Sequence, residues 1–270
     1  MITVAALRAH LDATIPFAWA ASWDRVGLLV GDPDAAVTRV LVSLDATHAA
    51  LDRAERAGAN VLVTHHPAFL EPLDVVVAAP GAAGIAFEAA RRGIALIACH
   101  TNLDRSPQGA DALPTVLGLA MRGPLEPRTL PDDTTPLAGR LCEPGTARTL
   151  GALASLVGER LGVGTRVWGD PASAVKLIAL APGSGRSLID AALQAGADAF
   201  VTGELRYHVA HDALEKGLAI VEAGHDATEW PLTGALARVV EQIPGLDAND
   251  VITDGISYPW RMVTKGNECT

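Results

Sequence analysis

The stretch Val61-Leu62-Val63-Thr64-His65-His66-Pro67 is an apolar run that ends abruptly in two adjacent histidines and a proline. Neighbouring side chains of a strand point to opposite faces, so two consecutive histidines inside a strand share no ligand. Pro67 cannot continue a central strand, and it biases His66 toward an extended or turn conformation. We therefore expect the chain to leave a sheet at His65 and His66, where both imidazoles can converge on one point. The alternative, two unrelated loop histidines, stays open on this stretch alone, because most histidines bind no metal.

The composition is that of a globular α/β protein. A chain of 270 residues fits one large or two modest domains and can bury a substantial core. Hydrophobic residues make up 49% of the chain and aromatic residues 4%, a balance that favours close packing of helices on sheets. The formal net charge of -10 argues against a broad surface for nucleic acids or anionic membranes.

The cysteines and the N-terminus point to a soluble, cytoplasmic chain. Cys99, Cys142 and Cys269 are odd in number and far apart, which argues against a disulfide framework and a thiolate zinc site. The segment Met1–Trp23 carries charged residues within its apolar part, so it predicts an amphipathic helix rather than a signal peptide. No apolar run approaches the length that spans a membrane.

Apolar segments of strand length alternate with segments of helical periodicity. This alternation predicts mainly parallel sheets with flanking helices, because a right-handed crossover connects one parallel strand to the next. The segment Arg122–Pro144 holds five prolines and few periodic apolar residues, so we interpret it as the connection into a second domain. We predict strands at 40–44, 61–64 and 94–99, and helices at 2–11, 49–57 and 84–92.

The second half of the chain repeats the first. Three pairs of segments match in the same order, at separations of 137, 138 and 124 residues. Chance similarity among runs rich in Ala, Gly and Val is the alternative, but ordered matches at nearly constant separation favour an internal duplication into two similar α/β domains. The matching pairs are 38–43 with 175–180, 57–64 with 195–202, and 93–97 with 217–221.

Polar side chains gather where the predicted strands end. Five of the eight histidines lie in four such tips, at the carboxyl ends where α/β sheets bind their ligands. In the last tip, His225 and Glu229 have i, i+4 spacing and lie on one face of a starting helix. The tips hold His65 and His66, then His100 and Asp104, then Glu204 and His208, and finally His225 and Glu229.

These residue types predict a metal centre. Histidine and carboxylate without thiolate suit zinc, manganese, iron or cobalt. Five such ligands are too many for one zinc site with an open position and too few to complete the coordination of two zinc ions. Two divalent ions bridged by a carboxylate, with positions left for water, accommodate them best, and such a pair is typical of hydrolases. The five residues are His65, His66, Asp104, His225 and Glu229.

The motifs together resemble the NIF3-like family of dinuclear-metal hexameric proteins, whose members are often labelled GTP cyclohydrolase 1 type 2 homologues. The resemblance runs in order over nearly the whole chain. One departure is Arg25, where the family usually has Asn, and it affects the lining of the pocket rather than the metal ligands. The motifs are Trp23-Asp24-Arg25-Val26-Gly27-Leu28, Thr64-His65-His66-Pro67, His100-Thr101-Asn102-Leu103-Asp104, Thr202-Gly203-Glu204, and Gly224-His225 with Glu229.

The resemblance implies a set of ligands, an assembly and a division of the chain. It implies that His65, His66, Asp104, His225 and Glu229 bind two divalent ions in each subunit of a toroidal hexamer. We expect a first domain from 1–125 plus 230–270, which carries the first three ligands. A second domain from 126–229 then ends in the other two.

The function that we expect is a metal-dependent hydrolase acting on a small molecule, with opening of the purine ring of GTP as one possibility. His100 is either a proton shuttle or a residue that holds Asp104. Glu204 and His208 are either further proton carriers or a surface pair on a helix. Gly183-Ser184-Gly185-Arg186 follows a predicted strand and is either an anion-binding turn or an ordinary connection. The alternative for the whole chain is a non-catalytic ring that holds metal or binds a partner.

Overall fold

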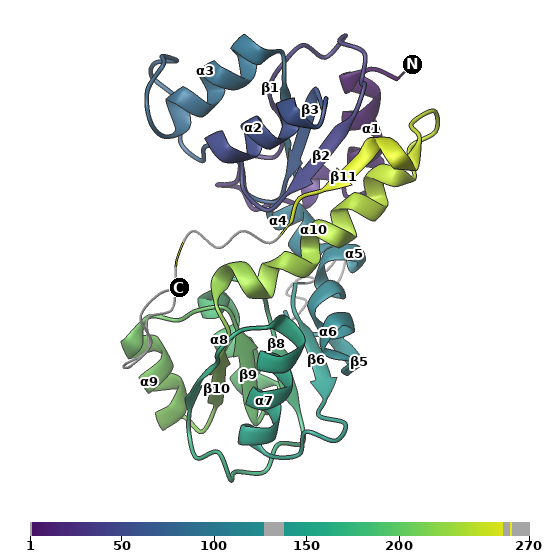
Figure 1. The fold of residues 1–270 in the computed structure, drawn as a ribbon. Coiled ribbons are helices and arrows are strands. Elements are labelled where there is room, and N and C mark those ends of the chain that lie inside the picture. The colour runs from purple at the N-terminus through teal and green to yellow at the C-terminus, as the bar shows by residue number, and fades with distance from the viewer. Residues whose placement is uncertain (1, 127–137, 256–259, 261–270) are drawn as a thin grey trace, which may run out of the picture.

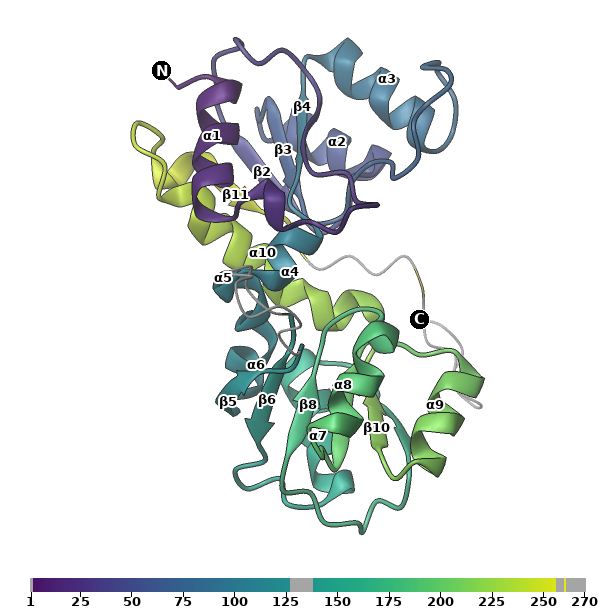
Figure 2. The same cartoon turned by 180° about the vertical axis from the view of Figure 1, so that it is seen from behind.

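The computed structural model describes residues 2–126, 138–255 and 260. It shows two α/β units, and the long helix α10 (His225–Glu241) runs from one unit to the other (Figure 1). The view from behind shows the same arrangement, with α10 passing between the two sheets (Figure 2). In the described residues, no helix is long and apolar enough to cross a membrane.

The first unit is a five-stranded sheet with helices on both faces. Its strand order is β1-β4-β3-β2-β11, and all neighbours are parallel except β1 and β4. Alternate residues of one strand serve the two faces: Val40 packs toward α1 and α10, and Leu41 packs toward α2 and α3. The elements are α1 (Val4–Thr14), η1 (Phe17–Trp19), β1 (Gly27–Val30), β2 (Val40–Ser43), α2 (His48–Arg56), β3 (Val61–Thr64), α3 (Ala82–Arg92), β4 (Ala95–Ala98), η3 (Ala248–Asp250) and β11 (Val251–Thr253).

The second unit is a six-stranded sheet in the order β5-β6-β8-β9-β10-β7. Its centre, β8-β9-β10, is parallel, and antiparallel strands lie on both sides of it. One face is covered by α7 and the other by α8 and α9. α4 (Thr101–Arg105) and α5 (Pro107–Ala110) connect the two units, and Leu103 of α4 packs in the core of the first unit. The elements of the second unit are α6 (Ala112–Leu117), β5 (Ala120–Pro124), β6 (Arg140–Glu143), α7 (Leu150–Leu161), β7 (Arg166–Trp168), β8 (Ile178–Leu180), η2 (Gly185–Leu188), α8 (Ile189–Gln194), β9 (Ala199–Thr202), α9 (Tyr207–Glu215) and β10 (Ala219–Glu222).

The repeat in the sequence corresponds to a repeat in the fold. The parallel strands β2, β3 and β4 stand in the first sheet as β8, β9 and β10 stand in the second. The two α/β units with mainly parallel central strands confirm the predicted fold class. The helices expected at 2–11, 49–57 and 84–92 are α1, α2 and α3, with ends that differ by up to three residues.

The connection predicted at Arg122–Pro144 is wrong at its two ends, which form strands. β5 and β6 pair antiparallel, with Ala120 opposite Glu143 and Pro124 opposite Arg140. A proline is tolerated at the end of an edge strand, because β5 needs donors on one side only. Residues 127–137 of this segment lie outside the described residues. The domain limits at 125/126 and 229/230 stay a proposal about folding units.

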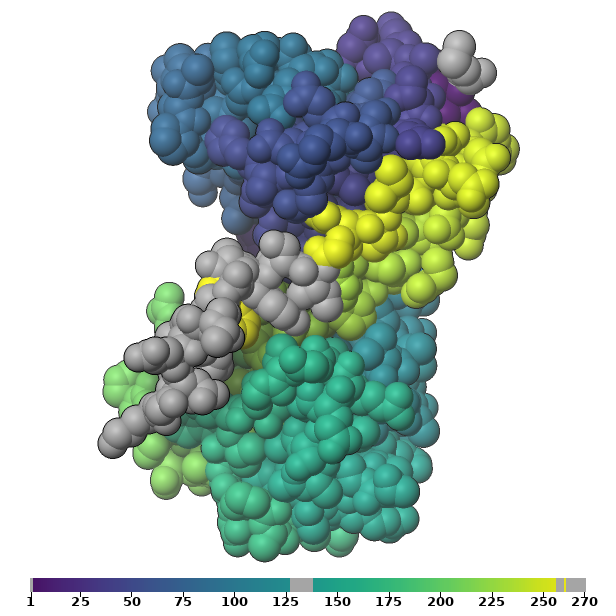
Figure 3. All heavy atoms as spheres, in the orientation of Figure 1, coloured from purple at the N-terminus to yellow at the C-terminus, as the bar shows by residue number. Residues whose placement is uncertain are grey.

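Helix α10 fixes how the two units lie together. It starts directly after β10 of the second sheet, and its later turns pack on the first sheet through residues such as Leu232, Leu236 and Val240. In the space-filling view, its yellow-green surface borders both units (Figure 3). The start of α10 therefore lies between the carboxyl ends of the two parallel strand sets.

Candidate metal centre

His65 and His66 leave β3 with both rings on one side. Their backbone amides still donate to Ser43 and Leu44 of the neighbouring chain segment, at 3.2 and 2.9 Å. The Thr64 hydroxyl donates to the carbonyl of His66 at 2.7 Å and fixes the turn out of the strand. The centroids of the two imidazoles lie 4.9 Å apart. The alternation of a strand has ended here, and consecutive histidines do converge.

Helix α10 brings His225 and Glu229 to the same point on successive turns. The carboxylate of Glu229 has only 8% of its side-chain surface exposed. Its Oε2 lies 2.9 Å from Nε2 of His66 and 3.0 Å from Nε2 of His225. Its Oε1 lies 3.8 Å from Nε2 of His65. Glu229 thus presents one oxygen to each side of the cluster.

Asp104 completes the cluster from α4. Its Oδ1 lies 3.7 Å from Nε2 of His65. The five residues predicted from the sequence as ligands therefore lie together between the two units. Among the residues that the structure describes, two overlapping groups of three are close enough to hold a metal ion, namely His65, His66 and His100, and then His66, His225 and Glu229.

The hydrogen bond made by Nδ1 of each imidazole determines whether Nε2 carries a proton or a free lone pair. Nδ1 of His65 faces the carbonyl of Cys99 at 3.0 Å, and Nδ1 of His66 faces a carboxylate oxygen of Asp45 at 2.8 Å. Nδ1 of His225 faces Glu204 at 3.0 Å. Carbonyl and ionised carboxylate oxygens only accept, so each Nδ1 must donate and carry the proton. Each neutral ring then turns the lone pair of Nε2 inward, the arrangement in which histidines bind metals.

Three buried atoms of the cluster lack a hydrogen-bond partner within the described parts of the chain: Nε2 of His65, Oδ1 of Asp104 and Oε2 of Glu229. Nε2 of His65 is an acceptor in the tautomer just derived, and the two carboxylate oxygens are acceptors when their groups are ionised. Buried acceptors left without a donor cost several kcal/mol, roughly 1–3 each and more for charged groups. A divalent cation satisfies every one of them, so the donor set fits a metal.

The pKa values of the cluster also reflect this excess of buried acceptors. Burial alone would lower the pKa of His66, but Asp45 and Glu229 outweigh it and raise the pKa to about 10. The hydrogen bond between His225 and Glu229 raises the pKa of His225 to about 9. Burial opposes ionisation of Glu229, yet the three imidazoles around it hold the pKa of this carboxyl well below its usual range. The negative potential that draws protons onto these rings is one that would also stabilise a cation.

His100 lies at the edge of the cluster, and its partner is Asp24. Nδ1 of His100 lies 2.8 Å from Oδ1 of Asp24, and its ring centroid lies 5.2 Å from that of His65. The amide of Thr101 donates to Oδ2 of Asp24 at 3.0 Å, and the Thr101 hydroxyl donates to the same oxygen. Burial opposes ionisation of Asp24, but these donors prevail and lower its pKa to about 2. Asp24 is therefore an anion that fixes the tautomer of His100.

Glu204 and His208 separate in the structure. Glu204 precedes α9 and contacts His225, so the two residues do not form a pair on one helix. His208 lies on α9, where its ring meets Tyr207 at 5.2 Å, away from the cluster. Of these two candidates, only Glu204 belongs to the site.

The sequence patterns alone give no role to Asp24, Asp45 or the glycines that admit Glu229. Gly183 has φ +60°, and a Cβ there would lie 2.0 Å from Oε1 of Glu229. A Cβ on Gly203 would lie 2.7 Å from Cα of His225. The only signals were that Asp24 and Gly203 stand in the quoted motifs and that Asp45 follows a predicted strand.

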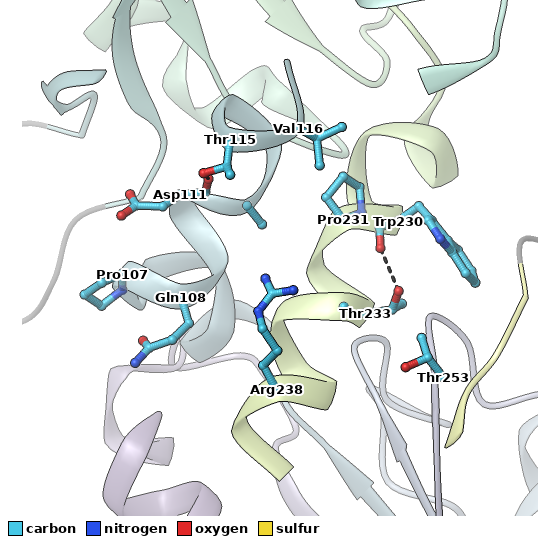
Figure 4. A pocket seen from close by; sticks show the side chains of 12 residues that line it. Pro107, Gln108, Asp111, Thr115, Val116, Trp230, Pro231, Thr233, Arg238 and Thr253 are labelled. Atoms are coloured by element: carbon cyan, nitrogen blue, oxygen red, sulfur yellow. Dashed lines mark hydrogen bonds between the residues drawn. The ribbon is translucent and has the colours of Figure 1, made fainter. Parts of the chain in front are cut away.

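A separate cavity of about 610 Å³ lies on another side of α10. α5, α6, α10 and β11 line it, and Arg238 extends into the space between α10 and the two short helices (Figure 4). Trp230 and Pro231 follow Glu229 in the chain but face this cavity. None of the predicted metal ligands lines it.

We predict that Gly183→Ala weakens metal binding, because the new methyl group collides with Glu229. The affinity for Zn²⁺, measured by competition with a chromophoric chelator, is expected to fall about 10- to 100-fold, as for other disturbed metal-site contacts. The matched control is Gly196→Ala, whose φ is +69° and whose Cβ would meet no atom within 4 Å. Both variants carry the same backbone strain. Equal affinities in the two would contradict the assigned role of Gly183.

Comparison with known proteins places the chain in a family. The family model for Duf34/NIF3 (NGG1p interacting factor 3) matches residues 2–254. A Streptomyces coelicolor protein named GTP cyclohydrolase 1 type 2 homolog is 38% identical, over 93% of this chain and 90% of its own length. A Clostridium perfringens protein of the same name is 29% identical, over 89% of this chain and 92% of its own length. The crystal structure of the Staphylococcus aureus hypothetical protein SA1388 superimposes with a TM-score of 0.88 at 28% identity, over 97% of this chain and 99% of that one. The chain belongs to the Duf34/NIF3 family.

Proposed function

We propose that this chain is a metal-dependent hydrolase with two divalent ions per subunit, of zinc, manganese, iron or cobalt. The observation that carries the proposal is the carboxylate of Glu229, which turns Oε1 toward His65 and Oε2 toward His66 and His225. His65 and Asp104 would hold one ion, His66 and His225 the other, and Glu229 would bridge them. Such a pair supplies Lewis-acid polarisation and lowers the pKa of water.

The Asp24–His100 pair supplies the proton transfer. Asp24 keeps the proton of His100 on Nδ1, which leaves Nε2 as the nitrogen that can accept one. His100 has 14% of its side chain exposed, so a small substrate can reach it. The ring takes a proton from the attacking water and returns it to the leaving group, while Asp24 stabilises the charged imidazolium.

The names of the relatives and the chemistry of paired metal ions suggest which substrates to test. The curated relatives carry the name GTP cyclohydrolase 1 type 2 homolog, so ring opening of GTP is the first reaction to test. Phosphoester hydrolysis is the second, because paired metal ions commonly hold the oxygens of phosphoryl groups. The alternative is a non-catalytic assembly in which the same centre has a structural role.

We predict that Glu229→Gln reduces the metal content and abolishes turnover. Wild-type protein reconstituted with metal is expected to approach two ions per chain by elemental analysis, and the variant one or fewer, because an amide neither bridges nor neutralises two cations. Glu241→Gln, at the last turn of the same helix, is the control and should match the wild type. A wild-type value of one ion per chain refutes the dinuclear proposal. No turnover of GTP or phosphoesters with both ions bound leaves the assembly as the function.

We predict that Asp24→Asn and Asp45→Asn affect different quantities, although each removes a carboxylate from Nδ1 of a histidine. Asp24→Asn should lower kcat about 10²- to 10⁴-fold with the metal content unchanged. Asp45→Asn should instead lower metal affinity about 10- to 100-fold, with the rate restored at high metal concentration. Steady-state kinetics and metal titration distinguish the two. A loss of metal in Asp24→Asn would make His100 a ligand rather than the proton carrier.

The toroidal hexamer implied by the resemblance stays a prediction. Light scattering at micromolar concentration is expected to give the mass of six chains of 27.9 kDa. A monomer under these conditions would exclude the ring.

A further inference from the structure

A cavity of about 570 Å³ opens at the carboxyl ends of β8 and β9, beside the metal centre. These strands are parallel neighbours in the second sheet, and the crevice beyond such strand ends is where α/β sheets bind ligands. Glu204 connects the cavity to the centre, because its carboxylate accepts from Nδ1 of His225. The lining residues are Ser184, Arg186, Glu204, Leu205 and Arg206.

Two guanidinium groups line this cavity without a carboxylate of their own. Neither Arg186 nor Arg206 makes a hydrogen bond or ion pair with any residue that the structure describes. The one acidic residue of the lining, Glu204, already pairs with His225. Other described arginines, such as Arg148 and Arg160, also lack such a partner, so what distinguishes Arg186 and Arg206 is that they line one cavity together. Paired arginines include Arg39, Arg53, Arg91, Arg92, Arg105, Arg122 and Arg166.

The backbone that carries these arginines is held in place. The amides of Gly203 and Glu204 both donate to the carbonyl of Gly183, at 2.9 and 3.1 Å. The amide of Leu205 donates to the buried carboxylate of Glu222 at 2.8 Å. The two loops that bear Arg186 and Arg206 are therefore joined to each other and anchored to β10. An anion that binds here loses less free energy to ordering of the loops.

We propose that this cavity is a phosphate subsite, in which Arg186 and Arg206 bind a phosphoryl group of the substrate while the metal centre acts on another part of it. This assignment rests on the proposed hydrolase function. Guanidinium groups match phosphate oxygens with paired, charge-assisted hydrogen bonds. Glu204 can accept from a hydroxyl group of the same ligand. The substrate is then a phosphorylated small molecule, such as a nucleotide.

The Gly183-Ser184-Gly185-Arg186 turn contributes through its arginine rather than through its amides. η2 is a single short turn, and Gly185 is packed so closely that a Cβ would lie 2.6 Å from the ring of Phe200. Anion binding at this turn, left open from the sequence, is thus assigned to the guanidinium of Arg186.

The test is binding of inorganic phosphate to chelator-treated protein, measured by calorimetry at low ionic strength. Removing the metal removes the cations that would otherwise bind phosphate at the neighbouring centre. Arg186→Gln and Arg206→Gln are each expected to weaken binding at least about tenfold, the usual effect of losing one charge-assisted hydrogen bond. Arg56→Gln, an exposed arginine on α2, is the control and should bind as the wild type does.

Kinetics of the metal-loaded protein distinguish a substrate subsite from a site for free phosphate. For a nucleotide substrate, the double variant is expected to raise KM with a smaller change in kcat, and for the corresponding nucleoside to change neither. Equal phosphate binding in the double variant and the wild type overturns the subsite. A nucleotide KM that does not change, although phosphate binding is lost, also overturns it. If the wild type hydrolyses nothing but still binds phosphate through these arginines, the hydrolase proposal fails and the anion site remains.

Discussion

The structure depends on the position of the Glu229 carboxylate, which lies nearly buried among three imidazoles that all turn Nε2 toward it. With a proton on each Nδ1, this point gathers only lone pairs and negative charge. Such an arrangement opposes folding unless a positive charge compensates it, because buried acceptors without a partner cost free energy. Protons on the histidines offset it in part, and a divalent cation would offset it fully. The metal centre is thus a constraint on the fold as well as a site.

Helix α10 links this constraint to the arrangement of the two units. Its first turns carry His225 and Glu229, and the hydroxyl of Thr228 accepts from the amide of Gly183 in the second unit at 3.0 Å. Its later turns belong to the core of the first sheet. The ligands from β3 and α4 therefore meet those of α10 only when both units hold the helix. Closing the centre and fixing the two units therefore depend on the same helix, and Gly183 and Gly203 matter because they leave room for Glu229 and His225 at its start.

Much of this could be predicted from the sequence, because the pattern of strand tips is local. The run that ends in His65 and His66, and the i, i+4 spacing of His225 and Glu229, are visible without coordinates. The contacts that orient the rings are not. Asp24 lies 76 residues from His100, and Glu204 lies 21 residues from His225. Such pairings follow from how loops cross the edge of a sheet, which no periodicity encodes. The strands at the ends of Arg122–Pro144 were missed for a similar reason, since their prolines outweighed a weak apolar pattern.

Glu204 is the residue through which the two parts of the site interact. Its carboxylate accepts from His225 and at the same time lines the cavity of Arg186 and Arg206. A negative charge beside the outer nitrogen of a histidine makes the inner nitrogen a stronger ligand. A phosphoryl group bound by the two arginines would bring further negative charge to the same side of His225. Substrate and metal would then strengthen each other's binding, because by linkage any coupling between two ligands acts equally in both directions. This coupling depends on the hydrogen bonds between the loops at Gly183 and Gly203, because they hold Glu204 between the cavity and His225.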